Sequence, residues 1–220
     1  MNQQRLWTRG AAALALVMSL GACAPLMVGG MVGGALVASD RRTSGIQLED
    51  ESIELRSANR IRDMLGSRVH INVTSYNRQV LLTGEVPAQK DKDYANQLVS
   101  QVDNVRSVVN ELVVAPTSSL ADRSMDTLIS GKVKASMVDT KDIFANAFKV
   151  VTERGTVYLM GRVTQREAQR ASDLARQVSG VKKVVRIFDI LTEEELQALL
   201  PAPPKSAAPV TAPAPAGNAK

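Results

Sequence analysis

The chain has 220 residues, with 27 Lys or Arg, 22 Asp or Glu and a formal net charge of +5, and this length suits one or two domains. Its single cysteine excludes an intramolecular disulfide. The chain also has only one histidine, so it offers no second histidine or free cysteine for a zinc site or a Cys–His catalytic pair. Aromatic residues make up 3%, so the cores must be built from Val, Leu, Ile and Met.

Residues 1–22 have the layout of a signal peptide, because Arg5 and Arg9 precede an apolar run from 11 to 20. The next residues, Leu20-Gly21-Ala22-Cys23, resemble the lipobox of bacterial lipoproteins. That resemblance implies cleavage before Cys23 and acylation of Cys23, with palmitate among the expected chains. The alternative is ordinary secretion with a chance cysteine at the cleavage site. In this class of protein, Ala24 in place of an aspartate implies the outer membrane.

Residues 24–38 are apolar and rich in glycine, and two interpretations stay open. The glycine spacing is typical of close-packed membrane helices. However, the segment 24–38 between Cys23 and the charged residues that start at Asp40 has only 15 residues, and a span needs about 20. We therefore predict that residues 23–48 are a lipidated cysteine and a flexible tether, with Asp40-Arg41-Arg42 in water.

An internal duplication organises the rest of the chain. Residues 80–86 and 157–163 share Val, Leu, Gly and Val at alternate positions, 77 residues apart, so these side chains lie on one face of a strand. A glycine on a buried strand face usually lets another backbone approach closely. Gly84 and Gly161 are therefore predicted to be structural.

The repeat extends on both sides of these strands. A second helix with apolar residues at three- and four-residue spacing follows each strand, and Asn77-Arg78 and Gly155 are predicted to form the hairpin turns. In the first helix, Ile53, Ile61 and Leu65 match Met125, Val133 and Met137 at a spacing of 72, and this spacing implies five extra residues before the first strand of the second repeat.

The predicted fold class is α+β, with two tandem units of helix–strand–strand–helix–strand. Each unit is a small mixed three-stranded sheet with two helices on one face. The units span residues 49–115 and 121–191. Residues 192–220 are predicted to be a short helix capped at Thr192, followed by a disordered Pro/Ala-rich tail.

The residues that carry catalysis in known enzymes are nearly absent, so no catalytic residue, metal site or cofactor is predicted. His70 lies between Val69 and Ile71 and is predicted to be a surface strand residue. Ser179 and Lys182 have the Ser-x-x-Lys spacing of penicillin-binding proteins, but the companion motifs are missing.

The order of elements and the residues around each second helix resemble the BON domain: Leu82-Thr83-Gly84, Leu159-Met160-Gly161, Asn104-Val105 and Gly180-Val181. With the lipobox, the chain resembles the dual-BON outer-membrane lipoproteins over about residues 20–191. The resemblance implies no enzyme activity and binding of anionic phospholipid through the second domain, at the inner leaflet of the outer membrane and facing the periplasm. It also implies a role in envelope integrity, with links to the division site and to the outer-membrane protein assembly machinery.

Charge and helix geometry point to the same surface. Residues 121–190 carry 13 Lys or Arg and 8 Asp or Glu, which favours an anionic partner, and in the envelope lipid is a closer candidate than nucleic acid. At 100° per residue, Leu128 lies about 120° from the middle of the predicted core row that begins at Met125, and the spacing of 72 puts Arg56 at its place in the first repeat.

The predicted phospholipid-binding residues lie on this first helix of the second unit: Arg123, Ser124, Leu128, Gly131 and Lys132. Alternatively, Leu128 packs against the first unit and covers a domain seam. Three function classes follow from these alternatives and the resemblance, and the residue inventory argues against the third, an enzyme. The first is a lipoprotein that binds anionic phospholipid, and the second is a periplasmic scaffold whose partner is a protein, such as the assembly machinery.

Overall fold

The computed structural model describes residues 40–199. The predicted signal peptide, Cys23, its tether up to residue 39 and the segment from residue 200 lie outside the described residues. The described residues belong to one compact unit, Ala38–Lys220. Among them, no helix has both the length and the apolar character needed to cross a membrane.

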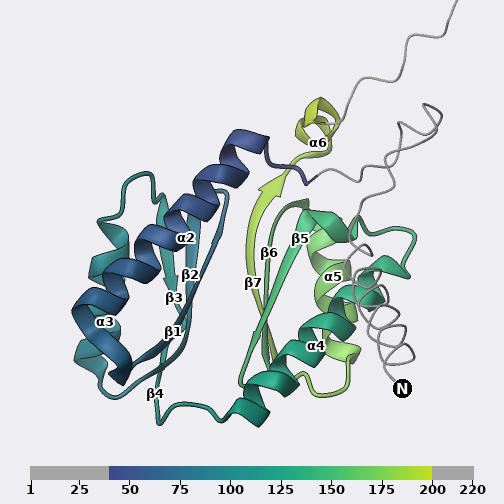
Figure 1. Ribbon diagram of the computed structural model, residues 1–220. Coiled ribbons are helices and arrows are strands. Elements are labelled where there is room, and N and C mark those ends of the chain that lie inside the picture. Colours follow the sequence, from purple (N-terminus) through teal and green to yellow (C-terminus); the bar gives the residue numbers. More distant parts are fainter. Residues whose placement is uncertain (1–39, 200–220) are drawn as a thin grey trace, which may run out of the picture. The chain divides into compact units, whose positions relative to one another are not determined.

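The first repeat forms a mixed sheet with two helices on one of its faces (Figure 1). Strand β1 runs antiparallel to β2, and β3 and β4 each run parallel to β2. In chain order, the elements are α2 (Ser44–Leu65), the short 3-10 helix η2 (Gly66–Arg68), β1 (His70–Tyr76), β2 (Gln79–Val86), α3 (Gln89–Ser100), β3 (Ser107–Asn110) and β4 (Val113–Val114). The predicted last strand is thus split in two, because Leu112 between the pieces is buried and its N–H bonds to the Asn110 side chain.

The second repeat has the same order of elements and a three-stranded sheet, β5-β6-β7. Its elements are α4 (Leu120–Val138), η3 (Ala145–Ala147), β5 (Phe148–Glu153), β6 (Thr156–Thr164), α5 (Gln165–Gln177) and β7 (Lys183–Leu191), and the short helix α6 (Glu193–Leu199) follows. Strand β5 is antiparallel and β7 parallel to β6. The predicted α+β class and the duplicated order of elements are confirmed.

The hairpin turns of the two repeats are built alike. Asn77 and Arg78 have φ of 51° and 62°, and Arg154 and Gly155 have φ of 53° and 76°, as expected for two-residue turns with positive φ at both positions. A buried aspartate on the preceding helix holds each turn. Asp50 accepts bonds from the N–H groups of Asn77 and Arg78, and Asp126 accepts them from Arg154 and Gly155.

These two aspartates show that the expected register of the first helices is wrong by one helical turn. Asp50 and Asp126 are 76 residues apart, so Ile53 corresponds to Ile129 and both are buried. Met125, which the sequence comparison had placed in the core row, is 55% exposed. With strands spaced by 77, the second repeat carries one extra residue before its first strand, and the expected five is wrong.

The start of the first repeat also differs from the expectation. Helix α2 begins at Ser44, five residues before the predicted boundary, and Asp40-Arg41-Arg42 does not end the tether in water. The Arg41 side chain is only 6% exposed and pairs with Glu167 at 2.7 Å. Arg42 pairs with Asp50 at 2.6 Å and stacks on the Tyr76 ring. Burial of these two guanidinium groups is tolerated because each pairs with a carboxylate.

Each repeat has its own hydrophobic core between sheet and helices. A third cluster joins the sheet faces that point away from the helices, and its buried members come from both repeats: Tyr76, Leu81, Tyr158, Met160 and Ile187. Polar bonds surround it, including Lys149 to Glu54 and Arg106 to Asp189, both at 2.7 Å. The two repeats therefore pack against each other within the compact unit.

Gly84 and Gly161 lie where a neighbouring backbone comes close. A Cβ at Gly84 would lie 2.1 Å from the carbonyl oxygen of His70, and a Cβ at Gly161 would lie 2.5 Å from that of Ala147. Gly84 also has φ of 113°, which side chains rarely adopt. Both positions therefore require glycine for packing.

Candidate lipid-binding face

Helix α4 is defined by its cap and by one buried row of side chains. Ser119 and Asp122 form a capping box that satisfies the first backbone N–H groups. The buried residues recur at three- and four-residue spacing and face the sheet: Asp126, Ile129, Val133 and Met137. The opposite side of α4 is consequently free to face solvent.

Leu128 lies on this outward side. At about 100° per residue, it is roughly 145° from the centre of the buried row. Its side chain is 57% exposed, so the described part of the first repeat does not cover it as a seam residue. Ser124 and Gly131, one turn away on either side, are exposed too. Leu120 and Val138 are exposed at the two ends of the helix, so the outward side of α4 is largely uncharged and partly apolar.

The cations of α4 differ in their availability. Lys132 is exposed next to the outward side. Arg123 is half-buried and donates to the backbone oxygen of Ser118 at 3.2 Å, so it faces the linker more than the solvent. Lys134 turns inward and donates to the carbonyl oxygens of Ala145 and Phe148, and burial lowers its pKa. Of the predicted cations, only Lys132 is fully placed for a surface contact.

An open groove of about 370 Å³ lies beside the N-terminal half of α4. Its lining brings together Met125 and two cations from other elements, Arg154 and Lys182. Sequence reasoning missed these residues, because it placed Met125 in the core and because Arg154 lies in the hairpin turn and Lys182 immediately before β7. Asp122 and Asp126 also line the groove, so it is a partly apolar hollow with charges of both signs, and Leu128 lies outside it.

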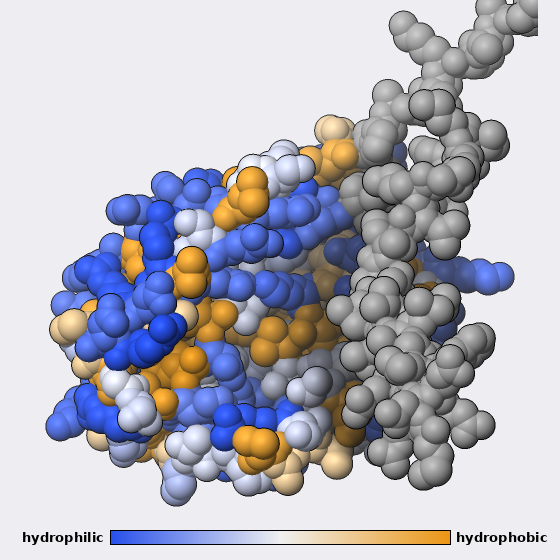
Figure 2. Space-filling model, in the orientation of Figure 1, coloured by the Kyte–Doolittle hydropathy of each residue, from blue (hydrophilic) through white to orange (hydrophobic). Residues whose placement is uncertain are grey.

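Exposed leucines also occur on the first helix of the first repeat, so exposure alone does not distinguish α4 from α2. Because the helices match at a spacing of 76, Ser52 corresponds to Leu128, and the expected match with Arg56 is wrong. Helix α2 exposes Leu48 and Leu55, which are 67% and 62% accessible. In the view of Figure 2, hydrophilic residues predominate and apolar ones reach the surface in separate patches. The helices differ more in charge, since α2 carries five acidic and three basic residues and α4 carries two and three.

His70 is not the surface strand residue that the sequence indicated. Its Nδ1 atom lies 2.9 Å from a carboxylate oxygen of Glu85, which is 1% exposed, and its side chain is only 18% exposed. Glu153 of the second repeat lies next to this pair. Burial alone would raise the pKa of Glu85, but hydrogen bonds from His70, Ser118 and Arg154 lower it. The pKa of Glu153 is raised by burial and by the charge of Glu85.

The duplicated fold and its paired glycines match a known family. The family model for the BON domain matches residues 50–116 and 125–191, so the chain belongs to the BON domain family and contains two such domains. It is 38% identical over 180 residues to the outer membrane lipoprotein DolP of Haemophilus influenzae, which covers 81% of this chain and 93% of that protein.

Two further relatives carry other names. The 21 kDa hemolysin of Actinobacillus pleuropneumoniae is 32% identical, over 68% of this chain and 78% of that protein. The osmotically-inducible protein Y of Escherichia coli is 32% identical, over 52% and 58% respectively. The similarity to each of these relatives extends beyond a single BON domain of this chain.

Proposed function

We propose that this protein is a non-enzymatic lipoprotein of the bacterial envelope. It is anchored by acyl chains on Cys23 in the inner leaflet of the outer membrane, and its second BON domain contacts anionic phospholipid. The observation that carries the proposal is the outward side of α4, where Leu128 is 57% exposed. Lys132 lies beside it, and Met125, Arg154 and Lys182 line the neighbouring groove. The similarity to the outer membrane lipoprotein DolP supports the location.

The expected contact is weak and adds to a lipid anchor. Full burial of a leucine side chain is worth about 1.5–3 kcal/mol, and a basic residue near an anionic surface about 1 kcal/mol. Partial insertion of Leu128 with two cations therefore gives roughly 4 kcal/mol, which corresponds to millimolar affinity. Such a contact orients an anchored protein and does not hold it at the membrane alone.

Vesicle flotation of a fragment that starts at Ala38 tests the proposal, because this fragment is the compact unit without the anchor. With lipid at millimolar concentration, near the expected Kd, part of the fragment should float with vesicles that contain phosphatidylglycerol and none with pure phosphatidylcholine. Added salt should weaken the binding, since charges are screened over about 8 Å at physiological ionic strength. The variant Leu128→Glu should abolish flotation and keep the melting temperature of the parent.

The matched control is Leu55→Glu, because Leu55 is a similarly exposed leucine on the outward side of α2. This control should float like the parent. If Leu55→Glu and Leu128→Glu reduce flotation equally, the contact does not belong to the second domain. If the parent does not bind anionic vesicles at all, the lipid part of the proposal is wrong.

The second candidate function is a periplasmic scaffold for a protein partner such as the outer-membrane protein assembly machinery. The short strand β4 favours it, because β4 pairs with β2 and leaves Val113 and Val114 42% and 47% exposed. Exposed strand edges are places where another chain can add a strand. Photo-crosslinking from position 113 in cells would capture such a partner, and the same probe at Leu55 is the control.

The proposed role in envelope integrity includes enrichment at the division site. It rests on the resemblance to the dual-BON lipoproteins. A fluorescent fusion to the full chain should concentrate at the septum, and Leu128→Glu should spread the fusion around the cell if the lipid contact directs it there. A uniform signal from the parent would contradict this part of the proposal.

A further inference from the structure

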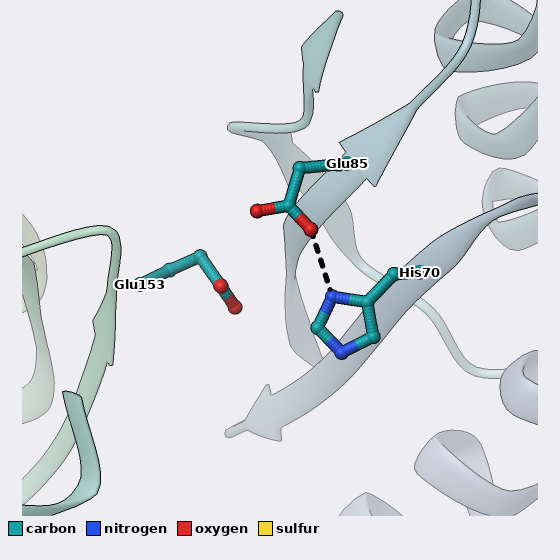
Figure 3. A group of neighbouring side chains, drawn as sticks. All are labelled: His70, Glu85 and Glu153. Carbon is teal, nitrogen blue, oxygen red and sulfur yellow. Dashed lines mark hydrogen bonds and ion pairs between the residues drawn. The ribbon is translucent and has the colours of Figure 1, made fainter. Parts of the chain in front are cut away.

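Three side chains with metal-binding atoms meet where the two BON domains pack together. His70 of β1 and Glu85 of β2 come from the first domain, and Glu153 of β5 comes from the second (Figure 3). One donor atom from each residue lies within 4.8 Å of the other two. Figure 3 shows the Glu153 carboxylate directed toward the His70–Glu85 pair.

Glu153 is buried, and one of its two carboxylate oxygens accepts no hydrogen bond from the described residues. It is 6% exposed, and one of its oxygens accepts a bond from the Asn72 amide at 3.0 Å. Its other oxygen, Oε1, is buried and has no hydrogen-bond partner among residues 40–199. A buried carboxylate oxygen without a partner is unfavourable, and a second carboxylate nearby makes it more so. A cation bound between the two carboxylates would satisfy both.

The groups around the cluster include more carboxylates than cations. Arg154 donates to Oε1 of Glu85 at 3.1 Å, and His70 faces Oε2 of the same group. Asp126 adds a further negative charge near Glu153. The cluster therefore places two carboxyl groups, Glu85 and Glu153, beside one guanidinium, Arg154.

We propose that His70, Glu85 and Glu153 bind one divalent transition-metal cation, with Zn²⁺ as the probe, and that this ion links the two BON domains. One imidazole nitrogen and two carboxylate oxygens form a mixed donor set that suits Zn²⁺, whereas Ca²⁺ and Mg²⁺ favour oxygen ligands alone. Zinc holds such ligands at about 2.0–2.2 Å, so donors around one ion lie roughly 3–3.5 Å apart. Binding therefore requires the donor atoms, which now lie within 4.8 Å of one another, to move closer together.

The sequence does not reveal this site, because its ligands are distributed over both repeats. Glu153 is 83 residues from His70, and two of the three ligands are carboxylates that look like ordinary strand residues. An ion held by both domains would oppose their separation. The site would therefore act on the packing between the domains. Arg154 contacts both this cluster and the groove beside α4, but none of the three proposed ligands lines that groove.

The full lipidated chain, purified in detergent without a histidine tag and stripped with a chelator, provides the test. Isothermal titration with ZnCl₂ should show one saturable site. At a hundredfold excess over Kd, the melting temperature should rise by roughly 5–10 °C. The variants His70→Gln and Glu153→Gln should each lose at least tenfold in zinc affinity, whereas Asp173→Asn, a surface carboxylate on α5, should bind like the parent.

Melting temperatures measured in chelator distinguish loss of zinc binding from loss of folding. Glu153→Gln removes a buried carboxylate with an unused oxygen, so it should melt at or above the parent temperature in chelator while losing the response to zinc. X-ray absorption of the zinc-loaded parent should show nitrogen and oxygen ligands. Absence of saturable binding, or equal binding by the parent and both ligand variants, would overturn the proposal.

Discussion

The carboxylate of Asp126 is the single group that we expect to fix the second domain most strongly. It is 6% exposed and accepts bonds from the backbone N–H groups of Arg154 and Gly155 at 2.7 and 2.8 Å. Asp126→Ala leaves both donors without a partner. A buried donor without a partner costs about 1–3 kcal/mol. Since the groove beside Arg154 can admit water, we expect a total loss of about 2–4 kcal/mol.

Urea and thermal denaturation of the 38–220 fragment measure this loss. For a domain of this size, each kcal/mol shifts the melting temperature by about 2–4 °C, so the expected drop is roughly 4–16 °C. Asp50→Ala should cost at least as much, because Asp50 also accepts a bond from the Ser75 hydroxyl and pairs with Arg42. The control Asp142→Ala removes a half-exposed charge and should change stability by at most about 0.5 kcal/mol. An Asp126→Ala fragment as stable as this control would show that the carboxylate does not hold the hairpin turn.

Three further predictions follow from the anchor, the strand packing and the buried ion pair. Cys23→Ala should leave the protein unprocessed or soluble, and its recovery with carbonate-washed outer membranes would contradict lipidation. Gly161→Val should cost about 1–3 kcal/mol in urea denaturation, because its Cβ meets the Ala147 carbonyl oxygen; parent-like stability would exclude this close packing. Burial would raise the pKa of Glu167, but bonds from Arg41 lower it, so its contribution is present above the ordinary pKa of 4.5 and is lost as the pH falls through the folded value. The stability difference between the parent and Glu167→Gln should therefore shrink on acidification, and a constant difference down to the acid transition would contradict this.

The strand repeat could be predicted from the sequence because it rests on alternation and on turn residues. The two glycines mark matching strands, and Asn77-Arg78 and Gly155 lie in the turns as expected. Helix register was harder to predict, because apolar residues at four-residue spacing look alike after a shift of one turn. The matched aspartates Asp50 and Asp126, whose partners are backbone amides of the hairpin turns, distinguish the true register.

Residues of the candidate lipid-binding face could be predicted from the sequence only where they belong to a single helix. Leu128 follows from the helical period of α4 alone, and its exposure agrees with an off-core position. The groove residues Arg154 and Lys182 come from other elements, so no local pattern brings them to α4. The same holds for Arg41, whose partner Glu167 is 126 residues away. Contacts of this kind depend on how the domains pack, which periodicity does not encode.

A direct test can distinguish contact of the second domain with the lipid surface, as proposed, from contact of the first. Gly131 of α4 and Leu55 of α2 occupy matched positions, 76 residues apart, and both are exposed. The 38–220 fragment has no cysteine of its own, since Cys23 is the only one in the sequence. A spin label can therefore be attached through Gly131→Cys or Leu55→Cys alone, and the first tolerates a side chain because no atom lies within 4 Å of its Cβ.

Power-saturation measurements of these labels on phosphatidylglycerol vesicles report whether each one lies in lipid or in water. We expect the label at 131 to become accessible to oxygen in the bilayer and protected from a water-soluble relaxing agent, while the label at 55 stays in water. A label at 131 that stays in water on vesicles to which the fragment is bound would contradict this expectation.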